Sequence, residues 1–422
     1  MNNLRNKAIS ILQANDRGGY TVPTTSGLYP AQWNWDSCLV ALGFAEYDEV
    51  RAWTEIETLF LGQWPDGMVP HIIFHGDDSS YFPNSAVWQG GPDKRSSGIT
   101  QPPVAATVVR YLTNRFGIEQ SRQHLEVLLP KLLKWHRWFY TARDPSGTGM
   151  AAIIHPWESG MDNSPIWDAA LAAVPPGPSV AGMRKDTGFA DVAVRPTSAE
   201  YDRYINLVIT YRDADYDADK LFELAPFRVC DVGFNSILLR ANKDLRFLLE
   251  LTGDSAGVSD VDGMIEKSRA AIDACWDDTD QFYYSRNSLT GELIKKPGIA
   301  GLLPLYSDDS VASRHPELIS RMKSWLAAVE VGVPSFEPGR PEFESKRYWR
   351  GPVWLVVNWM LLDGLKNNGY SELAESIRRS SVDIVAKSGF HEYFDPLSGE
   401  GLGGTDFSWT AAMVLFLSGM ND

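Results

Sequence analysis

Apolar residues recur at spacings of three and four along most of the 422-residue chain, which is the period of amphipathic α-helices. Residues 119–144 show the pattern in a stripe formed by Leu125, Leu128, Leu129, Leu132, Trp135 and Phe139. A similar stripe predicts a helix over 231–253, with Gly253 placed to end it. Further stripes predict helices over 2–13, 36–47, 48–62, 103–116, 199–212, 259–276, 316–328, 350–366, 372–387 and 407–418. Alternating strand patterns are few and short, so the chain is predicted to be all-α.

Segments rich in Gly, Pro and aromatic residues separate these helices. They cover residues 26–37, 62–74, 96–103, 155–165, 195–204, 344–354 and 391–409. No low-complexity tract or charged linker divides the chain into halves. We therefore expect one domain over residues 1–422, built as a closed ring of helical hairpins whose loops converge at one end on a central pocket. A helical protein of two domains is the alternative.

Composition and charge exclude several classes of partner. The formal net charge is −15, whereas nucleic-acid binding needs a net or local basic surface. No run of about eighteen apolar residues is present to span a membrane, and the N-terminus lacks the features of a secretory signal. The cysteines Cys38, Cys230 and Cys275 match no metal or redox spacing, which favours free buried thiols. We expect a cytoplasmic protein.

Aromatic residues are abundant, and many tryptophans lie beside Gly, Pro, Asn or Asp. The chain has 15 Trp, 16 Tyr and 18 Phe. Tyr29, Trp33, Trp35 and Asp36 lie within eight residues, directly before a helical stripe. Aromatic faces stack on sugar C–H surfaces, and an acid accepts hydrogen bonds from vicinal hydroxyls, so this mixture suits a carbohydrate. Asp36 or its neighbour Ser37 could instead simply cap the helix.

The segment HPWESGMDNSP, residues 155–165, carries two acids with no obvious basic partner. Glu158 and Asp162 lie on glycine-broken turns, and Ser164 with Pro165 is a helix-start signal that can take over any capping role. Spacing alone ranks neither acid above the other.

A second acidic segment lies near the C-terminus, where Glu392 and Glu400 flank or enter the glycine string 399–404. The string is not a phosphate loop, because no G-K-[ST] follows and no strand precedes it in the required unit. Glycines that let a loop approach a ligand are the better interpretation. One acid from each segment in a shared pocket would suit hydrolysis of a glycosidic bond.

The chain resembles the mannosylglycerate and glucosylglycerate hydrolases, relatives of glycoside hydrolase family 63. The resemblance is carried, in order from residue 27 to 412, by GLYPAQWNWDS, PHIIF, HPWESGMDNSP, RPTSAEYDRY, KRYWRGPVW and EYFDPLSGEGLGG...FSWTAA. It implies an (α/α)6 toroid, in agreement with the periodicity. It also implies an inverting mechanism, in which Asp162 protonates the glycosidic oxygen and Glu392 takes a proton from the attacking water.

The same resemblance implies which residues bind the substrate. Around the sugar ring it places Trp33, Trp35, Asp36, His71, Gln101, Trp349 and Trp354. Around a glycerate group it places Tyr29, Tyr81, Arg195 and Tyr201. The second set has physical sense, because a carboxylate needs a guanidinium fork and hydroxyl donors. No cofactor and no metal ion is implied.

We therefore expect an inverting α-glycosidase acting on a small anionic glycoside such as glucosylglycerate or mannosylglycerate. An α-glucosidase for neutral disaccharides or short oligosaccharides is the alternative enzyme. A sugar-binding module is the alternative outside the enzymes, disfavoured because binding alone does not need two acids on separate loops. A terpene cyclase lacks support because no D-D-x-x-D array is present. A small sugar substrate is the expected partner, without nucleic acid or membrane, and a homo-oligomer is compatible with the sequence.

Overall fold

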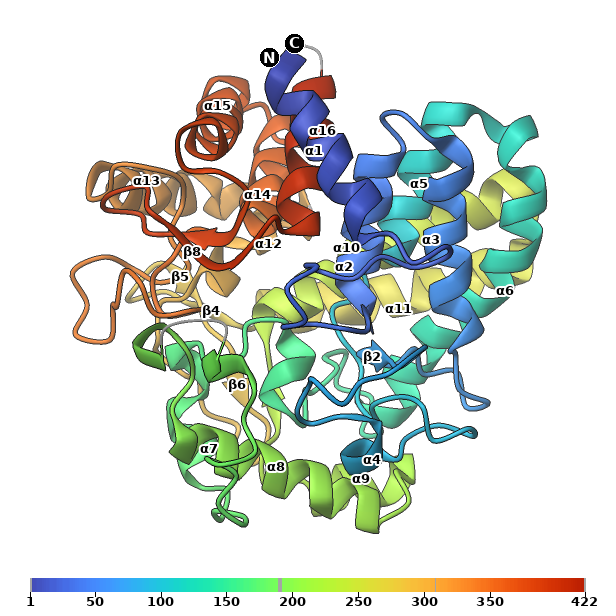
Figure 1. The fold of residues 1–422 in the computed structure, drawn as a ribbon, viewed down its shortest axis with the longest axis vertical. Coiled ribbons are helices and arrows are strands. Elements are labelled where there is room, and N and C mark those ends of the chain that lie inside the picture. The colour runs from blue at the N-terminus through green and yellow to red at the C-terminus, as the bar shows by residue number, and fades with distance from the viewer. Residues whose placement is uncertain (1, 189–191, 308, 421–422) are drawn as a thin grey trace.

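The computed structural model describes residues 2–188, 192–307 and 309–420, and a ring of helices forms its core (Figure 1). Each inner helix contacts the next around the ring, in the order α2 (Asn34–Phe44), α5 (Ala105–Phe116), α10 (Val232–Thr252), α12 (Pro304–Ser307), α14 (Leu355–Asn367) and α16 (Ser408–Gly419). Because α16 in turn contacts α2, the ring closes. The fold is the (α/α)6 toroid that the sequence predicted.

An outer layer of helices covers this ring. Its members are α3 (Glu49–Leu61), α6 (Ile118–Ala142), α11 (Ser255–Asp273), α13 (His315–Ala327), α15 (Ser371–Ser388) and α1 (Asn2–Asn15). Helix α1 packs on α16, so that the first helix completes the last hairpin (Figure 1). The layers differ in pattern, because α2 is buried along its whole length whereas α15 buries one stripe of residues. An outer helix needs only one apolar face, whereas a helix enclosed by neighbours, such as α2, is buried on all sides.

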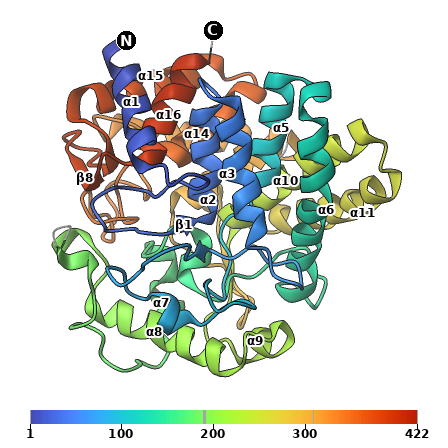
Figure 2. The same ribbon diagram turned by 45° about the vertical axis from the view of Figure 1, so that its right-hand side comes forward.

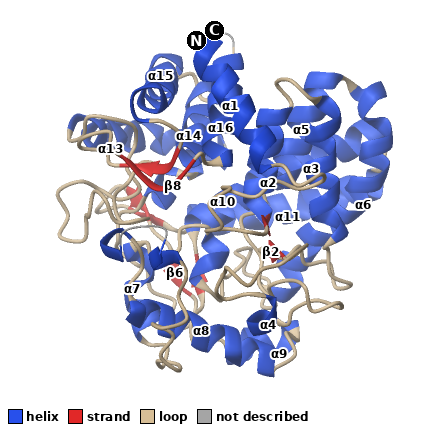
Figure 3. Cartoon of the chain, viewed as in Figure 1, coloured by secondary structure: helices blue, strands red, loops and turns tan. Residues whose placement is uncertain are grey.

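Short elements and long loops gather at one end of the ring. Figures 1 and 2 show α4 (Ser85–Trp88), α7 (Asp168–Ala172), α8 (Ser198–Asp213) and α9 (Ala218–Leu224) together below the main helices. The strands occupy little of the fold (Figure 3). They form four antiparallel pairs: β1 (Gln32–Trp33) with β2 (Ile72–Ile73), β3 (Val229–Cys230) with β6 (Arg286–Asn287), β4 (Trp276–Asp277) with β5 (Phe282–Tyr283), and β7 (His391–Phe394) with β8 (Gly401–Thr405).

All twelve predicted helices are present, but only eleven of them belong to the inner and outer layers of the toroid. The helix predicted over 199–212 is α8, which lies in the loop layer and not in the ring. The inner helix that replaces it is α12, whose four residues lie outside every predicted range. A single turn is too short to show a helical period in the sequence, which explains the omission.

Two smaller expectations can be compared with the structure. Helix α2 begins at Asn34, before the predicted start at 36, so Asp36 lies in the first turn and is not the cap. The three cysteines are free and buried, as predicted. In the described part of the chain, no helix has the length and hydropathy needed to cross a membrane.

Candidate active site

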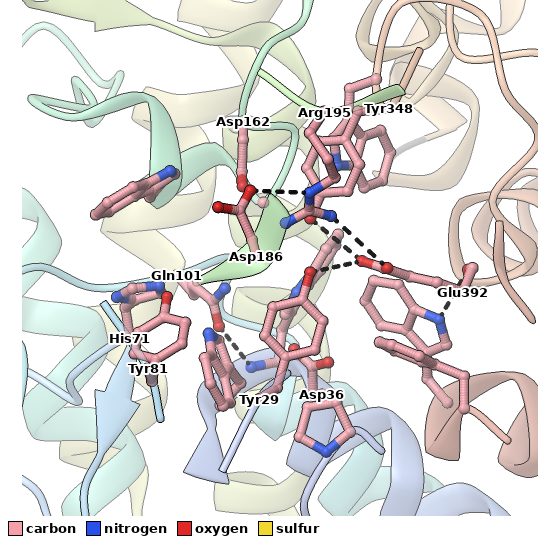
Figure 4. Close-up of a pocket in the computed structure, with 18 of the residues that line it drawn as sticks. Tyr29, Asp36, His71, Tyr81, Gln101, Asp162, Asp186, Arg195, Tyr348 and Glu392 are labelled. Carbon is pink, nitrogen blue, oxygen red and sulfur yellow. Dashed lines mark hydrogen bonds and ion pairs between the residues drawn. The ribbon is translucent and has the colours of Figure 1, made fainter. Parts of the chain in front are cut away.

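A pocket lies among the loops at this end of the ring (Figure 4). It encloses about 620 Å³, including its solvent-filled mouth. Its lining consists of Pro23, Tyr29, Trp33, Trp35, Asp36, His71, Tyr81, Gln101, Trp157, Gly160, Asp162, Asp186, Arg195, Tyr201, Tyr348, Trp349, Glu392, Phe407 and Trp409. Every predicted site residue except Trp354 is in this lining. The structure therefore brings together side chains that are more than 360 positions apart in sequence.

Trp354 lies one layer behind the pocket wall, which corrects its predicted place around the sugar. Its ring stacks on Trp349, with centroids 3.9 Å apart and planes 2° from parallel. It also stacks on Tyr393, and its indole N–H donates to the carbonyl oxygen of Tyr348 at 3.1 Å. Trp354 therefore supports two wall residues and does not touch the cavity.

Glu392, on β7, is buried and held by three donors. The hydroxyl groups of Tyr29 and Tyr348 donate to its Oε1 at 3.0 and 3.3 Å. The backbone N–H of Gly404 donates to Oε2 at 3.0 Å. Burial raises the pKa of Glu392, and the Arg195 guanidinium together with these donors opposes the rise. The three hydrogen bonds thus fix the orientation of the Glu392 carboxylate, and the positive charge of Arg195 lies close to it.

The glycine string makes room for the side chain of Glu392. Gly403 on β8 has φ +73°, and a Cβ atom there would lie 2.4 Å from Oε2 of Glu392. Only glycine fits such a close approach in this backbone conformation. The string therefore lets a strand approach a carboxylate of the protein itself, which differs from the predicted approach to a ligand. Glu400, in the same string, is exposed and pairs with Lys346 outside the pocket.

Asp162 lies in the loop after the 3-10 helix η1 (Pro156–Ser159), on a different wall from Glu392 (Figure 4). Burial raises the pKa of Asp162 to about 7, with Arg195 opposing the rise and the charge of Glu392 adding to it. A carboxyl group with this pKa keeps its proton at neutral pH for much of the time, as a general acid must. Burial thus raises the pKa of both acids, and Glu392 differs from Asp162 in accepting three hydrogen bonds that favour its charged form.

Glu158 lies within η1, four residues before Asp162, and is not part of the pocket lining. Its Oε1 accepts hydrogen bonds from Arg143 at 2.9 Å and from the backbone N–H of Thr100 at 3.3 Å. Its Oε2 accepts from the backbone N–H of Ile154 at 2.8 Å. The structure thus gives Glu158 a buried partner that the sequence did not show, and this acid holds the loop in place.

Asp36 adds a third carboxyl group to the pocket, from the first turn of α2. Burial raises its pKa to about 8, and the charges of Glu392 and Asp162 act in the same direction. A neutral carboxyl group can both donate and accept hydrogen bonds, which suits a pair of sugar hydroxyls.

The wall predicted for the sugar is largely aromatic. Trp35 lies against Trp349, with ring centroids 6.2 Å apart, and the backbone N–H of Trp35 donates to Oε1 of Gln101 at 3.2 Å. The ring of His71 stacks on Trp157. Burial holds the pKa of His71 well below its usual value, so this imidazole is neutral. Neutral polar groups between aromatic faces are typical of a sugar-binding pocket.

The wall predicted for glycerate contains Arg195 and Tyr201. A capping box formed by Thr197 and Glu200 starts α8 just after Arg195 and places Tyr201 in its first turn. Tyr81, also predicted here, meets the ring of Trp33 edge-on with centroids 5.3 Å apart. Tyr29 differs from the other residues predicted for glycerate, because its hydroxyl group donates a hydrogen bond to Glu392.

Seven lining residues were not predicted: Pro23, Trp157, Gly160, Asp186, Tyr348, Phe407 and Trp409. All but Pro23 and Asp186 lie in the aromatic-rich segments that the sequence marks, so a signal for them was present. Asp186 lies outside these aromatic-rich segments, and only its position in the pocket lining and its ion pairs in the structure reveal it. In the described ranges, no group of three or more His, Cys, Asp or Glu side chains is arranged to hold a metal ion.

Comparison with known proteins identifies the family. The domain model described as mannosylglycerate hydrolase MGH1-like glycoside hydrolase matches residues 29–410. The chain belongs to this family. Among members of this hydrolase family, mannosylglycerate hydrolase MGH1 of Selaginella moellendorffii is 48% identical over 96% of this chain and 83% of its own length. A glucosylglycerate hydrolase of Mycolicibacterium hassiacum is 34% identical over 97% of this chain and 96% of its own.

A solved structure of the family shows the same architecture. It is the glycoside hydrolase family 63 mannosylglycerate hydrolase of Thermus thermophilus, in complex with Tris and D-glycerate. It superposes with a TM-score of 0.93 at 44% identity, and the match covers 98% of this chain and 100% of that one. The protein is therefore a glycoside hydrolase with the fold of this family.

Proposed function

We propose that this hydrolase cleaves the α-glycosidic bond of a hexosylglycerate, either mannosylglycerate or glucosylglycerate, with inversion at the anomeric carbon. The observation that carries the proposal is the contrast between two carboxyl groups in one pocket. Asp162 has a pKa raised to about 7, whereas Glu392 is fixed by three hydrogen-bond donors beside Arg195. The activities of the relatives named above support the choice of substrate.

In the proposed reaction, Asp162 donates its proton to the glycosidic oxygen as the bond to the anomeric carbon breaks, and glycerate leaves. Glu392 accepts a proton from a water molecule that attacks this carbon from the opposite face. Sugar and glycerate are the two products. Asp162 has then lost a proton and Glu392 has gained one, and exchange with solvent restores both groups to their starting states. The hydroxyl donors Tyr29 and Tyr348 hold Glu392 so that one lone pair remains aimed at the water.

We assign the remaining pocket residues to two subsites. Trp33, Trp35, Asp36, His71, Gln101 and Trp349 surround the sugar. Tyr81, Arg195 and Tyr201 contact the glycerate carboxylate and hydroxyl groups, because a guanidinium and two phenols supply the charge and donors that this group needs. Tyr29 is assigned both to this end of the pocket and to the support of Glu392.

We further propose that residues 1–422 form one catalytic domain that acts in the cytoplasm. The ring needs helices from both ends of the chain, since α1 packs on α16 and α16 on α2. Three free cysteines suit a reducing compartment.

The test is a panel of α-glucosyl and α-mannosyl glycerates and the matching glycerol glycosides, with release of free sugar as the readout. We expect kcat/KM to be larger for one or both glycerates than for the uncharged analogues, and proton NMR to show the β-anomer first. Equal turnover of the uncharged compounds would favour an α-glucosidase of neutral substrates. Binding without any turnover would favour a sugar-binding module, and release of the α-anomer would contradict inversion.

A further inference from the structure

Arg195 lies between two carboxylates. Its Nε donates to Oδ2 of Asp186 at 3.3 Å, and its Nη1 lies 3.8 Å from Oε2 of Glu392. That Nη1 atom is buried and makes no hydrogen bond to any described residue. The guanidinium carbon lies 4.4 Å from the ring centre of Tyr348, which restrains the guanidinium from a further side. Arg195 is thus bonded to Asp186 and stops just short of Glu392.

Asp186 is anchored by a second arginine, Arg184. Arg184 grips its carboxylate with both arms of the guanidinium, Nε to Oδ1 at 3.0 Å and Nη2 to Oδ2 at 2.7 Å. Arg184 also donates to the carbonyl oxygen of Pro196 at 2.8 Å and lies 4.0 Å from the ring centre of Tyr201. Asp186 is therefore fixed, and Arg195 must adapt to it.

The cluster of Arg184, Asp186 and Arg195 is buried, with the three residues 7%, 8% and 4% exposed. Removing charges from water is costly, and a buried ion cluster is weak evidence for added stability. The placement of Asp186 in the lining of the pocket suggests a role in the reaction.

We propose that Asp186 is a positioning residue of this hydrolase, which holds Arg195 back from Glu392 and so keeps the base free to accept a proton from water. The proposal rests on the proposed function in assigning the base to Glu392. A charge-assisted hydrogen bond between a guanidinium and a carboxylate has a length of about 2.8 Å. The separation of 3.8 Å means that Nη1 needs to move only about 1 Å to form one. Such a pair would lower the proton affinity of Glu392 and occupy a lone pair that the water needs.

The charged and titratable groups around Arg195 decide whether loss of Asp186 raises or lowers the pKa values of the proposed acid and base. Carboxyl groups face it from three segments, Asp186, Asp162 and Glu392, and phenols face it from Tyr29, Tyr348, Tyr393, Tyr201 and Tyr81. The guanidinium lowers the pKa of both Asp162 and Glu392 against the effect of burial. The negative charge of Asp186 offsets part of this influence. Without it, the pKa values of the proposed acid and base should both fall.

The experiment compares the pH dependence of kcat/KM for the wild type, Asp186→Asn and Arg184→Gln. In Asp186→Asn we expect both limbs of the bell-shaped profile to move to lower pH by about one unit. We also expect kcat/KM at pH 7 to fall by about fivefold, since a pKa lowered from about 7 by about one unit reduces the protonated fraction of the acid from about a half to about a tenth. In Arg184→Gln both limbs should move to higher pH, because a positive charge is lost and Asp186 can draw Arg195 further from Glu392.

Two controls accompany these variants. Asp186→Glu keeps the charge and should restore most of the wild-type profile. Asp260→Asn removes an acid that pairs with Arg137 on the surface, and its profile should equal that of the wild type. Thermal unfolding checks that each variant is folded. If Asp186→Asn does not fold, the shift in Arg184→Gln carries the test by itself.

The proposal is overturned if the limbs of Asp186→Asn stay in place, or if the two variants shift in the same direction. The profiles are measured on the α-glycoside of the panel that the wild type turns over fastest. A wild type that prefers uncharged glycosides would therefore contradict the proposed substrate and leave the test of Asp186 intact, because the displaced limbs report on the acid and base and not on the substrate's charge.

Discussion

Glu158 and Asp162 are only four residues apart, in η1 and the loop that follows it, yet their surroundings give them different properties. Glu158 is paired with Arg143 and accepts two backbone hydrogen bonds, so its charge is compensated inside the protein. Asp162 faces the cavity, where burial and the charge of Glu392 favour its protonated form. The same residue type thus serves the structure at one position and is suited to chemistry at the other.

Substitution should separate these two roles. Asp162→Asn and Glu392→Gln should each lower kcat by about 10²–10⁴-fold, because they remove the proposed proton donor and the proposed proton acceptor. Glu158→Gln should keep the chemistry but lower the free energy of unfolding by about 3 kcal/mol, because it leaves the buried Arg143 without a counter-charge. Steady-state kinetics and urea denaturation measure the two effects. An inactive, stable Glu158→Gln enzyme would show that the acid has been assigned to the wrong carboxyl group.

Asp36 makes the stability of the fold depend on pH. Its pKa is about 8 in the folded protein and 3.8 for an ordinary aspartate, so between these values the folded state binds more protons than the unfolded state. Its contribution to stability is therefore present at low pH and is lost as pH rises toward 8. Asp36→Asn removes this titration, so its stability relative to the wild type should increase between pH 5 and pH 8, by up to about 4 kcal/mol. Urea denaturation at both pH values tests this, and parallel curves for the two proteins would contradict it.

The composition of the loops marked the segments that supply most of the pocket, and the family resemblance pointed to individual residues within them. The sequence could not tell which of two tryptophans five positions apart faces the cavity, and Trp354 proved to support Trp349 from behind. Nor could it find Asp186, which lies nine residues before its partner Arg195 in a stretch with no pattern. Side-chain direction and ion pairing within a loop are decided by tertiary contacts, and a single sequence does not record them.

At the scale of elements, the β7–β8 hairpin ties backbone conformation to the proposed base. Gly403 and Gly399 both have positive φ, +73° and +75°. A Cβ on Gly403 would lie 2.4 Å from Glu392, whereas at Gly399 the nearest atoms are 3.8 Å away. A comparison of substitutions at Gly399 and Gly403 therefore separates the cost of backbone strain, which both share, from the effect of displacing the Glu392 carboxylate, which only Gly403 has.

Alanine at these two positions should have different consequences. Gly399→Ala should lower stability by about 1 kcal/mol through strain alone and leave kcat unchanged. Gly403→Ala should lower kcat as well, by about tenfold or more, because its Cβ displaces the carboxylate of Glu392, the proposed base. Thermal unfolding and kinetics of both variants provide the comparison. Equal kcat values in the two variants would mean that the hairpin does not control Glu392.

The helices were predictable to the extent that they are long and periodic. The stripe that predicted α6, for example, matches the buried residues Leu125, Leu128 and Leu129 of that helix. The pattern did not show which helices form the ring, because α8 has the same period as its neighbours but packs among the loops. Helix α12 was missed because its four residues form part of the ring only through contacts with α10 and α14.

At the scale of the whole molecule, a network of ion pairs around the buried Asp244 connects three inner helices. Asp244 on α10 is fully buried and accepts hydrogen bonds from Arg110 on α5 at 2.6 Å and from Arg240 at 2.9 Å. Arg240 in turn donates to Asp363 on α14 at 2.6 Å. Asp244→Ala should therefore destabilise the fold by about 1–3 kcal/mol, less than the loss of a fully buried pair, because Arg110 is 34% exposed and Arg240 keeps Asp363 as a partner.

The matched control is Asp260→Asn, which breaks an exposed pair with Arg137 and should change stability by about 0–1 kcal/mol. Urea denaturation measures both variants, and kcat at 25 °C should be unaffected in each because neither residue lines the pocket. A similar small effect in both would mean that the network is balanced by its desolvation cost.

The closure of the ring also determines the order in which this chain can fold. Asn15, at the end of α1, donates to Ser408 at the start of α16, 393 positions away, and the hydroxyl of Ser408 donates to the carbonyl oxygen of Val22. Helix α16, buried along most of its length, packs on α1 and α2. During synthesis these two N-terminal helices therefore leave the ribosome long before their partner exists, with apolar faces still open to water. Contacts of such long range slow folding and lengthen the time during which exposed surface can aggregate. A toroid that closes in this way can form its central pocket only after the last hairpin, α16 with α1, has been completed.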